Sequence, residues 1–172
     1  MSAETREVWQ RGPIEGVTAL LQPVAHALLQ AVEEAERYTE NFPAELLWKR
    51  PADVASAGFH LLHIRGVVDR LFTYARGEAL TADQLKDLSA EKEGIDPLQT
   101  RDLVKAFRLQ VEKAIVQLQN TPESILSERR TIGRKQIPTT VSGLLFHAAE
   151  HTQRHIGQLL VTVRILQSKN WI

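Results

Sequence analysis

The stretch that decides the fold of this chain is residues 140–167, which read TVSGLLFHAAEHTQRHIGQLLVTVRILQ. Apolar residues recur along it at the three- and four-residue spacing of an amphipathic α-helix. The centre of its apolar arc is formed by Leu145, Ala148, Leu159, Val163 and Leu166. The pattern predicts a long helix that begins near Thr140 or Ser142, ends near Gln167 and buries one face.

Three more long helical patterns precede this one. They cover about residues 21–41, 56–76 and 100–119. Ser56 and Thr100 are residue types that cap helix N-termini, so we expect them to begin the second and third long helices. Thr81 with Gln84 resembles a capping box, which predicts a short extra helix over residues 82–91.

Prolines and glycines mark the connections between these patterns. Residues 43–54 contain two prolines and are predicted to connect the first and second long helices. Gly94 and Pro97 break the chain before the third long helix. Residues 124–139 hold several charges, a glycine and a proline, and we expect them to form an ordered loop before the last helix.

The chain is therefore predicted to be all-α. We expect a four-helix bundle, with antiparallel helices and a short extra helix between the second and third long helices. Its 172 residues, of which 43% are hydrophobic and 24% charged, suit one domain over residues 1–172. Residues 1–12 are expected to be a loose N-terminal segment.

The composition narrows the classes of function. There is no cysteine, which excludes disulfides, cysteine-ligated zinc and a thiol nucleophile supplied by the protein. The 21 basic residues balance the 21 acidic ones, so nothing resembles the basic surface of a nucleic-acid-binding protein. No apolar run is typical of a signal peptide or a membrane span. We expect a cytoplasmic protein with neither nucleic acid nor membrane as a partner.

The histidines are the residues that indicate a metal site. The six in the chain are His26, His60, His63, His147, His151 and His155. Three of them are spaced four residues apart in the last helix, where residues i and i+4 lie nearly above one another, roughly 6 Å apart along the axis. Two imidazoles at that spacing form half of a metal site. Catalytic zinc commonly has three protein ligands and an open position, so a third ligand has to come from another helix.

The apolar arcs indicate which histidines face the core. In the last helix His155 lies just inside the arc, His151 at its edge and His147 further toward the polar side. The pair His151 and His155 therefore fits a site at the edge of the core best. In the second helix His60 lies nearer the apolar centre than His63, so periodicity alone does not select His63.

Two segments resemble a known family. Residues 59–64 (FHLLHI) and 147–158 (HAAEHTQRHIGQ) are similar to the two histidine motifs of the DinB-like (DinB/YfiT) metalloenzymes. The most specific part is the ending His-x-x-x-His-x-Gly-Gln, and the resemblance extends from about residue 13 to residue 166. It implies a four-helix bundle whose connectivity differs from a simple up-and-down bundle. It also implies one divalent metal ion, zinc or nickel, bound by His63, His151 and His155.

The resemblance also suggests a function. Members include thiol-dependent transferases and isomerases that use low-molecular-weight thiols, and they often form dimers. We therefore expect a metal-dependent enzyme, such as a thiol-dependent S-transferase or a hydrolase, that acts on a small-molecule substrate, and we expect a homodimer. Two alternatives stay open: a non-catalytic metal-binding protein related to stress, and a helical interaction module whose histidines bind no metal.

Further residues are candidates for supporting roles. Arg129, Arg130 and Arg134 form a basic cluster that could bind an anionic substrate, although a solvated loop explains such a cluster equally well. His60 and His147 are extra histidines near the expected site. The side chains that could orient the ligands are those of Glu150, Asp69 and Gln158, and Glu150 projects to the polar side.

Overall fold

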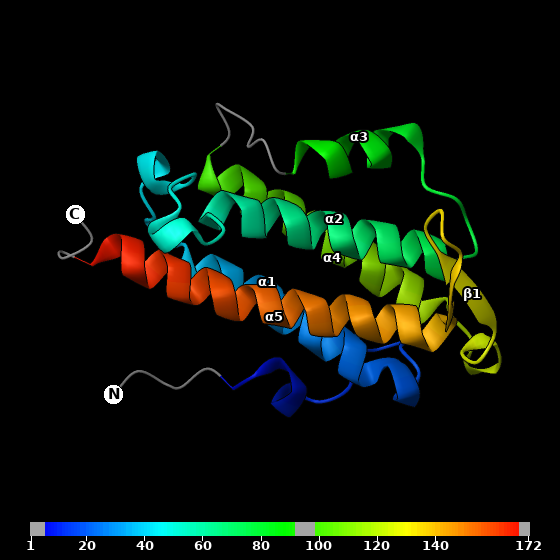
Figure 1. The fold of residues 1–172 in the computed structure, drawn as a ribbon. Helices are drawn as coiled ribbons and strands as arrows, with labels where there is room; N and C mark the ends of the chain where they lie inside the picture. The colour runs from blue at the N-terminus through cyan, green and yellow to red at the C-terminus, as the bar shows by residue number, and fades with distance from the viewer. Residues whose placement is uncertain (1–5, 92–98, 169–172) are drawn as a thin grey trace.

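The computed structural model describes residues 6–91 and 99–168. Its α-helices are α1 (Gln22–Tyr38), α2 (Ala57–Ala75), α3 (Ala82–Ala90), α4 (Thr100–Gln119) and α5 (Val141–Gln167). Two short strands, β1 (Arg129–Ile132) and β2 (Ile137–Thr140), precede α5. In the described ranges, 3-10 helices cover Val8–Arg11, Ala19–Leu21, Ala44–Leu46, Pro51–Asp53 and Glu123–Ile125. The prediction of an all-α bundle of four long helices with a short extra helix is confirmed (Figure 1).

The long helices do not alternate in direction along the chain, as they would in a simple up-and-down bundle. α1 and α2 each pack mainly against α4 and α5. The colours of Figure 1 show that α1 and α5 run in the same direction, as do α2 and α4. The prediction that all neighbouring helices are antiparallel is therefore wrong. Two connections explain the difference: residues 39–56 cross one end of the bundle, and the segment that contains α3 runs back along α2, so that α4 can follow the direction of α2 (Figure 1).

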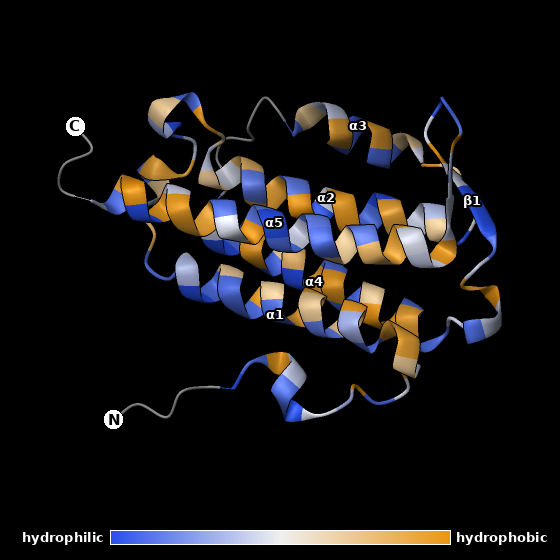
Figure 2. Ribbon diagram, turned by 60° about the horizontal axis from the view of Figure 1, so that its bottom comes forward, coloured by the Kyte–Doolittle hydropathy of each residue, from blue (hydrophilic) through white to orange (hydrophobic). Residues whose placement is uncertain are grey.

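The core lies between the four long helices. Each contributes side chains that are fully buried, for example Leu28, Leu61, Phe107 and Leu145. Figure 2 shows that the hydrophobic residues alternate with hydrophilic ones along each helix, as the apolar spacing predicts. Burying one such side chain stabilises the fold by about 1.5–3 kcal/mol. Within the described part of the chain, none of the helices combines the length and the apolar character that a membrane span needs.

Side chains begin three of the helices as expected. The hydroxyl of Ser56 accepts a hydrogen bond from the Phe59 N–H (3.1 Å) and begins α2. Thr81 and Gln84 form the predicted capping box of α3, and Thr140 caps α5. The prediction for α4 is wrong, because its N-cap is Gln99, which makes no side-chain cap bond, and the predicted cap residue is the first helical residue. The predicted break at residues 94 and 97 lies outside the described residues.

A β-hairpin replaces the predicted loop before α5. β1 and β2 pair antiparallel, with Arg129 opposite Thr140 and Ile132 opposite Ile137. The prediction was wrong because each strand has only four residues, which is too short for a clear alternating pattern. Pro138 is tolerated because a two-stranded sheet consists of edge strands.

Part of the N-terminal segment is anchored on α1. Val8 is buried, and its N–H donates a hydrogen bond to the side chain of Gln30 (3.0 Å). Arg11 forms an ion pair with Glu33 of the same helix (2.5 Å). Residues 6–12 are thus held against the bundle, in contrast to the loose segment that we expected, whereas residues 1–5 lie outside the described residues.

We predict that Ser56→Ala lowers the free energy of unfolding by about 1 kcal/mol, because it leaves an N–H at the start of α2 without its side-chain acceptor. Chemical denaturation measures the change. Ser127→Ala is the matched control, since Ser127 is exposed and lies outside the helices. Equal stability of the two variants would show that this cap does not stabilise α2.

Candidate metal centre

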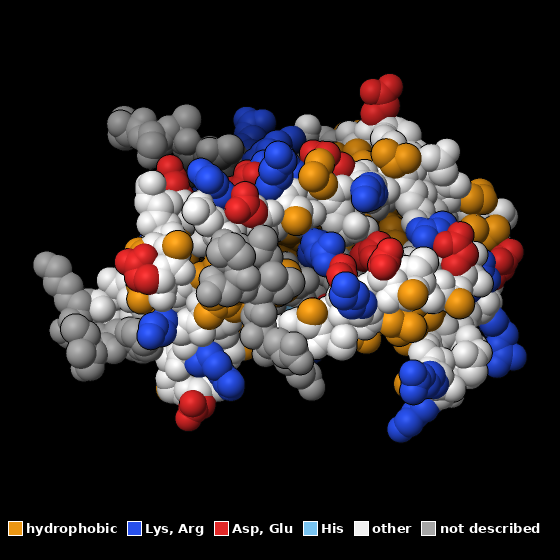
Figure 3. Space-filling model, turned by 90° about the horizontal axis from the view of Figure 1, so that it is seen from above, with side chains coloured by type: hydrophobic (Ala, Val, Ile, Leu, Met, Phe, Trp, Pro, Cys, Tyr) orange, Lys and Arg blue, Asp and Glu red, His pale blue; other side chains and the backbone are white. Residues whose placement is uncertain are grey.

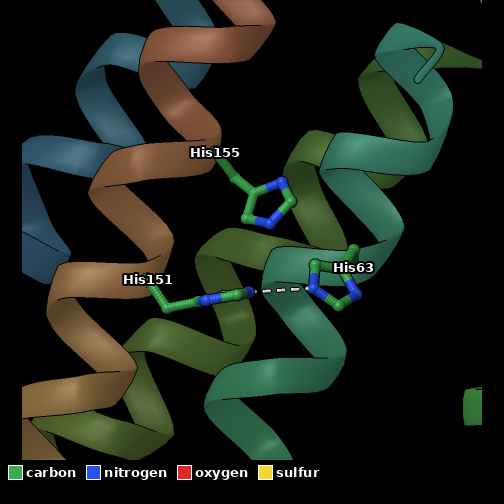
Figure 4. Close-up of side chains that lie close together, drawn as sticks. All are labelled: His63, His151 and His155. Atoms are coloured by element: carbon green, nitrogen blue, oxygen red, sulfur yellow. Dashed lines mark hydrogen bonds between the residues drawn. The ribbon is translucent and has the colours of Figure 1, made fainter. Parts of the chain in front are cut away.

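Three histidine side chains meet where α2 crosses α5. His63 comes from α2, and His151 and His155 come from successive turns of α5 (Figure 4). The Nε2 atoms of His63 and His151 are 3.0 Å apart, and one ligand atom from each of the three rings lies within 4.8 Å of the others. The structure therefore brings together the three histidines that the family resemblance selected.

The spacing of these nitrogens suits one cation. Two nitrogens bound tetrahedrally to the same zinc ion at about 2.0–2.1 Å are roughly 3.3–3.4 Å apart, slightly more than the 3.0 Å between the Nε2 atoms of His63 and His151. The ring centre of His155 lies 4.6 Å from each of the other two ring centres. Imidazole is a ligand for zinc, nickel and other first-row divalent metals. Within the described residues, this is the one group of histidine and carboxylate side chains found close enough together to hold a metal ion.

Hydrogen bonds occupy the Nδ1 atoms of His63 and His155, and the Nε2 atom of His63 forms a further hydrogen bond with the Nε2 atom of His151 (Figure 4). The Nδ1 atom of His63 lies 2.7 Å from a carboxylate oxygen of Glu91, to which an Nδ1–H donates. The Nδ1 atom of His155 lies 2.9 Å from the Nδ1 atom of His60. If His155 donates this bond, His60 accepts it and carries its own proton on Nε2. Both ligand candidates then present an Nε2 lone pair to the shared space, as metal ligands require.

Burial favours the neutral form of His60, His151 and His155 by lowering the pKa of each ring. It lowers the pKa of His155 to about 3, with further contributions from the neighbouring histidines, first His63. It also lowers the pKa of His60 to about 4, with the His63 ring as the second cause. The pKa of His151 is lowered as well, first by burial and then by His63. The neutral imidazole is the form that binds metals, so these environments favour ligation at neutral pH.

Glu91 connects the site to a buried ion pair. One of its carboxylate oxygens faces His63, and the other lies 2.5 Å from a guanidinium nitrogen of Arg70. The side chains of Glu91 and Arg70 are only 5% and 9% exposed. His63, Gly66 and Arg70 lie along one face of α2, and a Cβ at Gly66 would collide with both Glu91 and Arg70. The glycine therefore provides the space in which this carboxylate reaches the histidine.

The remaining histidines have different surroundings. His60 is 3% exposed and touches the cluster only through His155. His147 is exposed and its ring centre lies 5.4 Å from that of His151, which places it at the rim. His26 is elsewhere, 3.1 Å from the carbonyl oxygen of Gly12. His60 can thus orient a ligand, whereas the geometry gives no such role to His147.

The side chains that the sequence suggested as orienting groups do not reach the histidines in that role. Glu150 pairs with Arg154, which lowers the pKa of the carboxyl group. Asp69 accepts a hydrogen bond from Gln84, and Gln158 is exposed. The orienting carboxylate is instead Glu91, a residue that sequence reasoning missed because nothing near it in the chain indicates burial or a histidine partner.

The basic cluster lies at another end of the bundle. Arg130 donates to the carbonyl oxygen of Ala75 (2.9 Å) and pairs with Glu128, so it serves to attach the hairpin to α2. Ala75 is twelve residues beyond His63 on α2, roughly 18 Å along the helix axis. Arg129 and Arg134 belong to the same hairpin region. The cluster is therefore not beside the three histidines.

The fold and the histidine cluster define a class, that of helical-bundle proteins able to hold a divalent cation between two helices. The chain belongs to the DinB superfamily, whose family model matches residues 24–159. That range includes α2 and the histidines of α5. The family assignment made from the two histidine motifs is confirmed.

The comparison with solved structures supports the same fold. The chain is similar to a protein from Streptococcus pneumoniae whose crystal structure has been determined, with 15% sequence identity and a TM-score of 0.61. The match covers 82% of this chain and 86% of that chain. At this level of identity the likeness concerns the fold alone. No curated protein matches this chain.

We predict that Glu91→Gln weakens zinc binding by about 10- to 100-fold, because the neutral amide is a poorer acceptor for the His63 Nδ1–H than the carboxylate. Competition with a chromophoric chelator measures the affinity. Asp87→Asn is the matched control, since it removes another ion pair between α3 and α2, that with Arg65, without touching a histidine. If both variants bind zinc equally well, Glu91 does not orient His63.

Proposed function

We propose that this protein is a metal-dependent enzyme that holds one divalent ion, zinc or nickel, on His63, His151 and His155 and acts on a small-molecule substrate. The observation that carries the proposal is the convergence of three imidazoles from two helices. With three protein ligands, a tetrahedral ion keeps one position open, as in catalytic zinc sites, whereas structural sites are closed by a fourth protein ligand. The three side chains are partly exposed, so the open position can be reached from solvent.

The reaction that we propose is the attack of a small thiol, or of water, on an electrophilic substrate. A divalent ion held by neutral imidazoles retains its full charge and lowers the pKa of a water molecule or thiol bound to it. The chain contains no cysteine, so a thiol has to come from a low-molecular-weight cosubstrate. Glu91 and His60 hold two of the ligands in the orientation and tautomer that binding requires.

A non-catalytic metal-binding protein is the second candidate. It shares the three histidines and differs only in lacking a substrate pocket beside them. Surface cavities of about 520 Å³ and 930 Å³ are both lined by other residues, and this observation favours the second candidate. A homodimer, which the family resemblance implies, stays a prediction.

We predict about one zinc or nickel ion per chain in untagged protein that has been incubated with the metal and dialysed, and loss of that ion in His63→Ala and His155→Ala. Elemental analysis gives the stoichiometry, and circular dichroism checks that the variants remain folded. His147→Ala should retain the ion, because this exposed histidine of α5 lies at the rim. A folded wild-type protein without metal would leave a helical bundle whose histidines serve another purpose.

We also predict that a small thiol changes the visible absorption spectrum of the cobalt-loaded protein, because the thiol occupies the open position as a thiolate. 2-Mercaptoethanol is the probe, and 2-methoxyethanol, which lacks the thiol, is the matched control. A response to the thiol alone supports the transferase. If cobalt binds and neither compound changes its spectrum, the thiol-dependent reaction is excluded while the metal site stands.

A further inference from the structure

A second candidate binding site lies between α3 and the β-hairpin, away from the histidines. It is a cavity of about 930 Å³, within the range typical of small-molecule sites. The cavity is lined by the end of α2, the connection to α3, one side of α3 and the hairpin. Two segments of the chain, residues 74–88 and 129–138, thus enclose a space that neither of them fills.

One wall of this cavity is apolar. Leu85 and Leu88 of α3 line it, and they are 48% and 41% exposed. α3 has no buried residue, so its apolar side chains are not covered by the described part of the bundle. Tyr74 and Pro138 extend the same lining from α2 and the hairpin. Large apolar side chains that are gathered in a concave surface favour a ligand with an apolar body.

Another part of the lining carries positive charge. Arg129 and Arg134 line the cavity, and within the described residues neither side chain forms an ion pair or a hydrogen bond. Arg130 is different because its guanidinium is engaged with Ala75 and Glu128. The one acidic residue of the lining, Glu78, is paired with Arg76. At this end of the molecule basic and hydrophobic side chains lie close together (Figure 3).

We propose that this cavity binds a small molecule with an apolar body and an oxyanion group, either a carboxylate or a phosphate. The apolar body would lie against Leu85 and Leu88, and the oxyanion would pair with Arg129 and Arg134, since guanidinium groups match both anions geometrically. The residue Ala75, which Arg130 contacts, is roughly 18 Å along α2 from His63. The site is therefore separate from the histidine cluster, and ligand binding to it does not depend on a metal ion.

Calorimetry with three related probes tests the proposal. 2-Naphthoate and 2-naphthyl phosphate share one apolar body and carry the two anionic groups, while 2-naphthamide is the uncharged counterpart. We expect saturable binding of at least one anion, at least tenfold tighter than that of the amide, in wild type and equally in His63→Ala. The tighter of the two anions identifies the preferred oxyanion. Binding that requires the intact histidine cluster would overturn the assignment to this cavity.

Variants locate the bound probe. Arg129→Ala and Arg134→Ala should each weaken binding of the anion by roughly fivefold, as for partly exposed charge pairs. Lys135→Ala is the matched control, because it removes a positive charge from the same turn at a residue that does not line the cavity. Leu88→Ser should weaken binding of both the anion and the amide. Equal losses in the lysine and arginine variants, or no binding of any probe to wild type, would contradict the proposal.

Discussion

The contact between α2 and α5 is the constraint on which the rest of the structure depends. It is the most extensive contact between two helices in the bundle, and it brings His60 and His63 against His155 and His151, residues that are 88 to 95 positions apart in the chain. The contact is apolar at its centre, because the buried residues of both helices belong to one hydrophobic cluster. Hydrophobic packing of these two helices therefore sets the distance between the imidazoles.

Bringing several imidazoles to the edge of a core carries an electrostatic consequence. Burial disfavours their protonated forms, and the two Nε2 atoms 3.0 Å apart are joined by a hydrogen bond in which one neutral ring donates and the other accepts. A shared cation would replace that hydrogen bond, with both nitrogens as ligands. The ion pair of Arg70 and Glu91 is explained by its contact with His63 more than by its contribution to stability. Buried ion pairs contribute little net stability, but this one holds a carboxylate where His63 needs an acceptor.

Among the peripheral elements, α3 is joined to the bundle mainly by polar contacts, whereas the hairpin also packs Ile132 against the core. α3 contributes no buried residue and is attached through Glu91, through the pair of Asp87 with Arg65, and through Gln84. The hairpin is attached to α2 through Arg130. Apolar side chains of α3 and basic side chains of the hairpin line the same cavity. The same arrangement that fixes the orienting carboxylate thus also creates the cavity between α3 and the hairpin.

The sequence by itself determined the helices and half of the site. Apolar spacing and side-chain caps are local properties, so Ser56 and Thr140 predicted where α2 and α5 begin, and His151 and His155 lie together on any helix. It did not determine the parallel neighbours in the bundle or the hairpin, because connection paths and four-residue strands leave little local pattern.

Only the tertiary structure decided which partners the histidines have. The packing of α2 against α5 brings His63 to His151 and His60 to His155. The apolar spacing of α2 alone did not show which of its two histidines would join His151 and His155. Glu91 lies 28 residues from His63, and in the sequence its charge is indistinguishable from that of a solvated surface residue. Glu91 has its role because it is buried and contacts His63, and neither property can be predicted from its neighbours in the sequence.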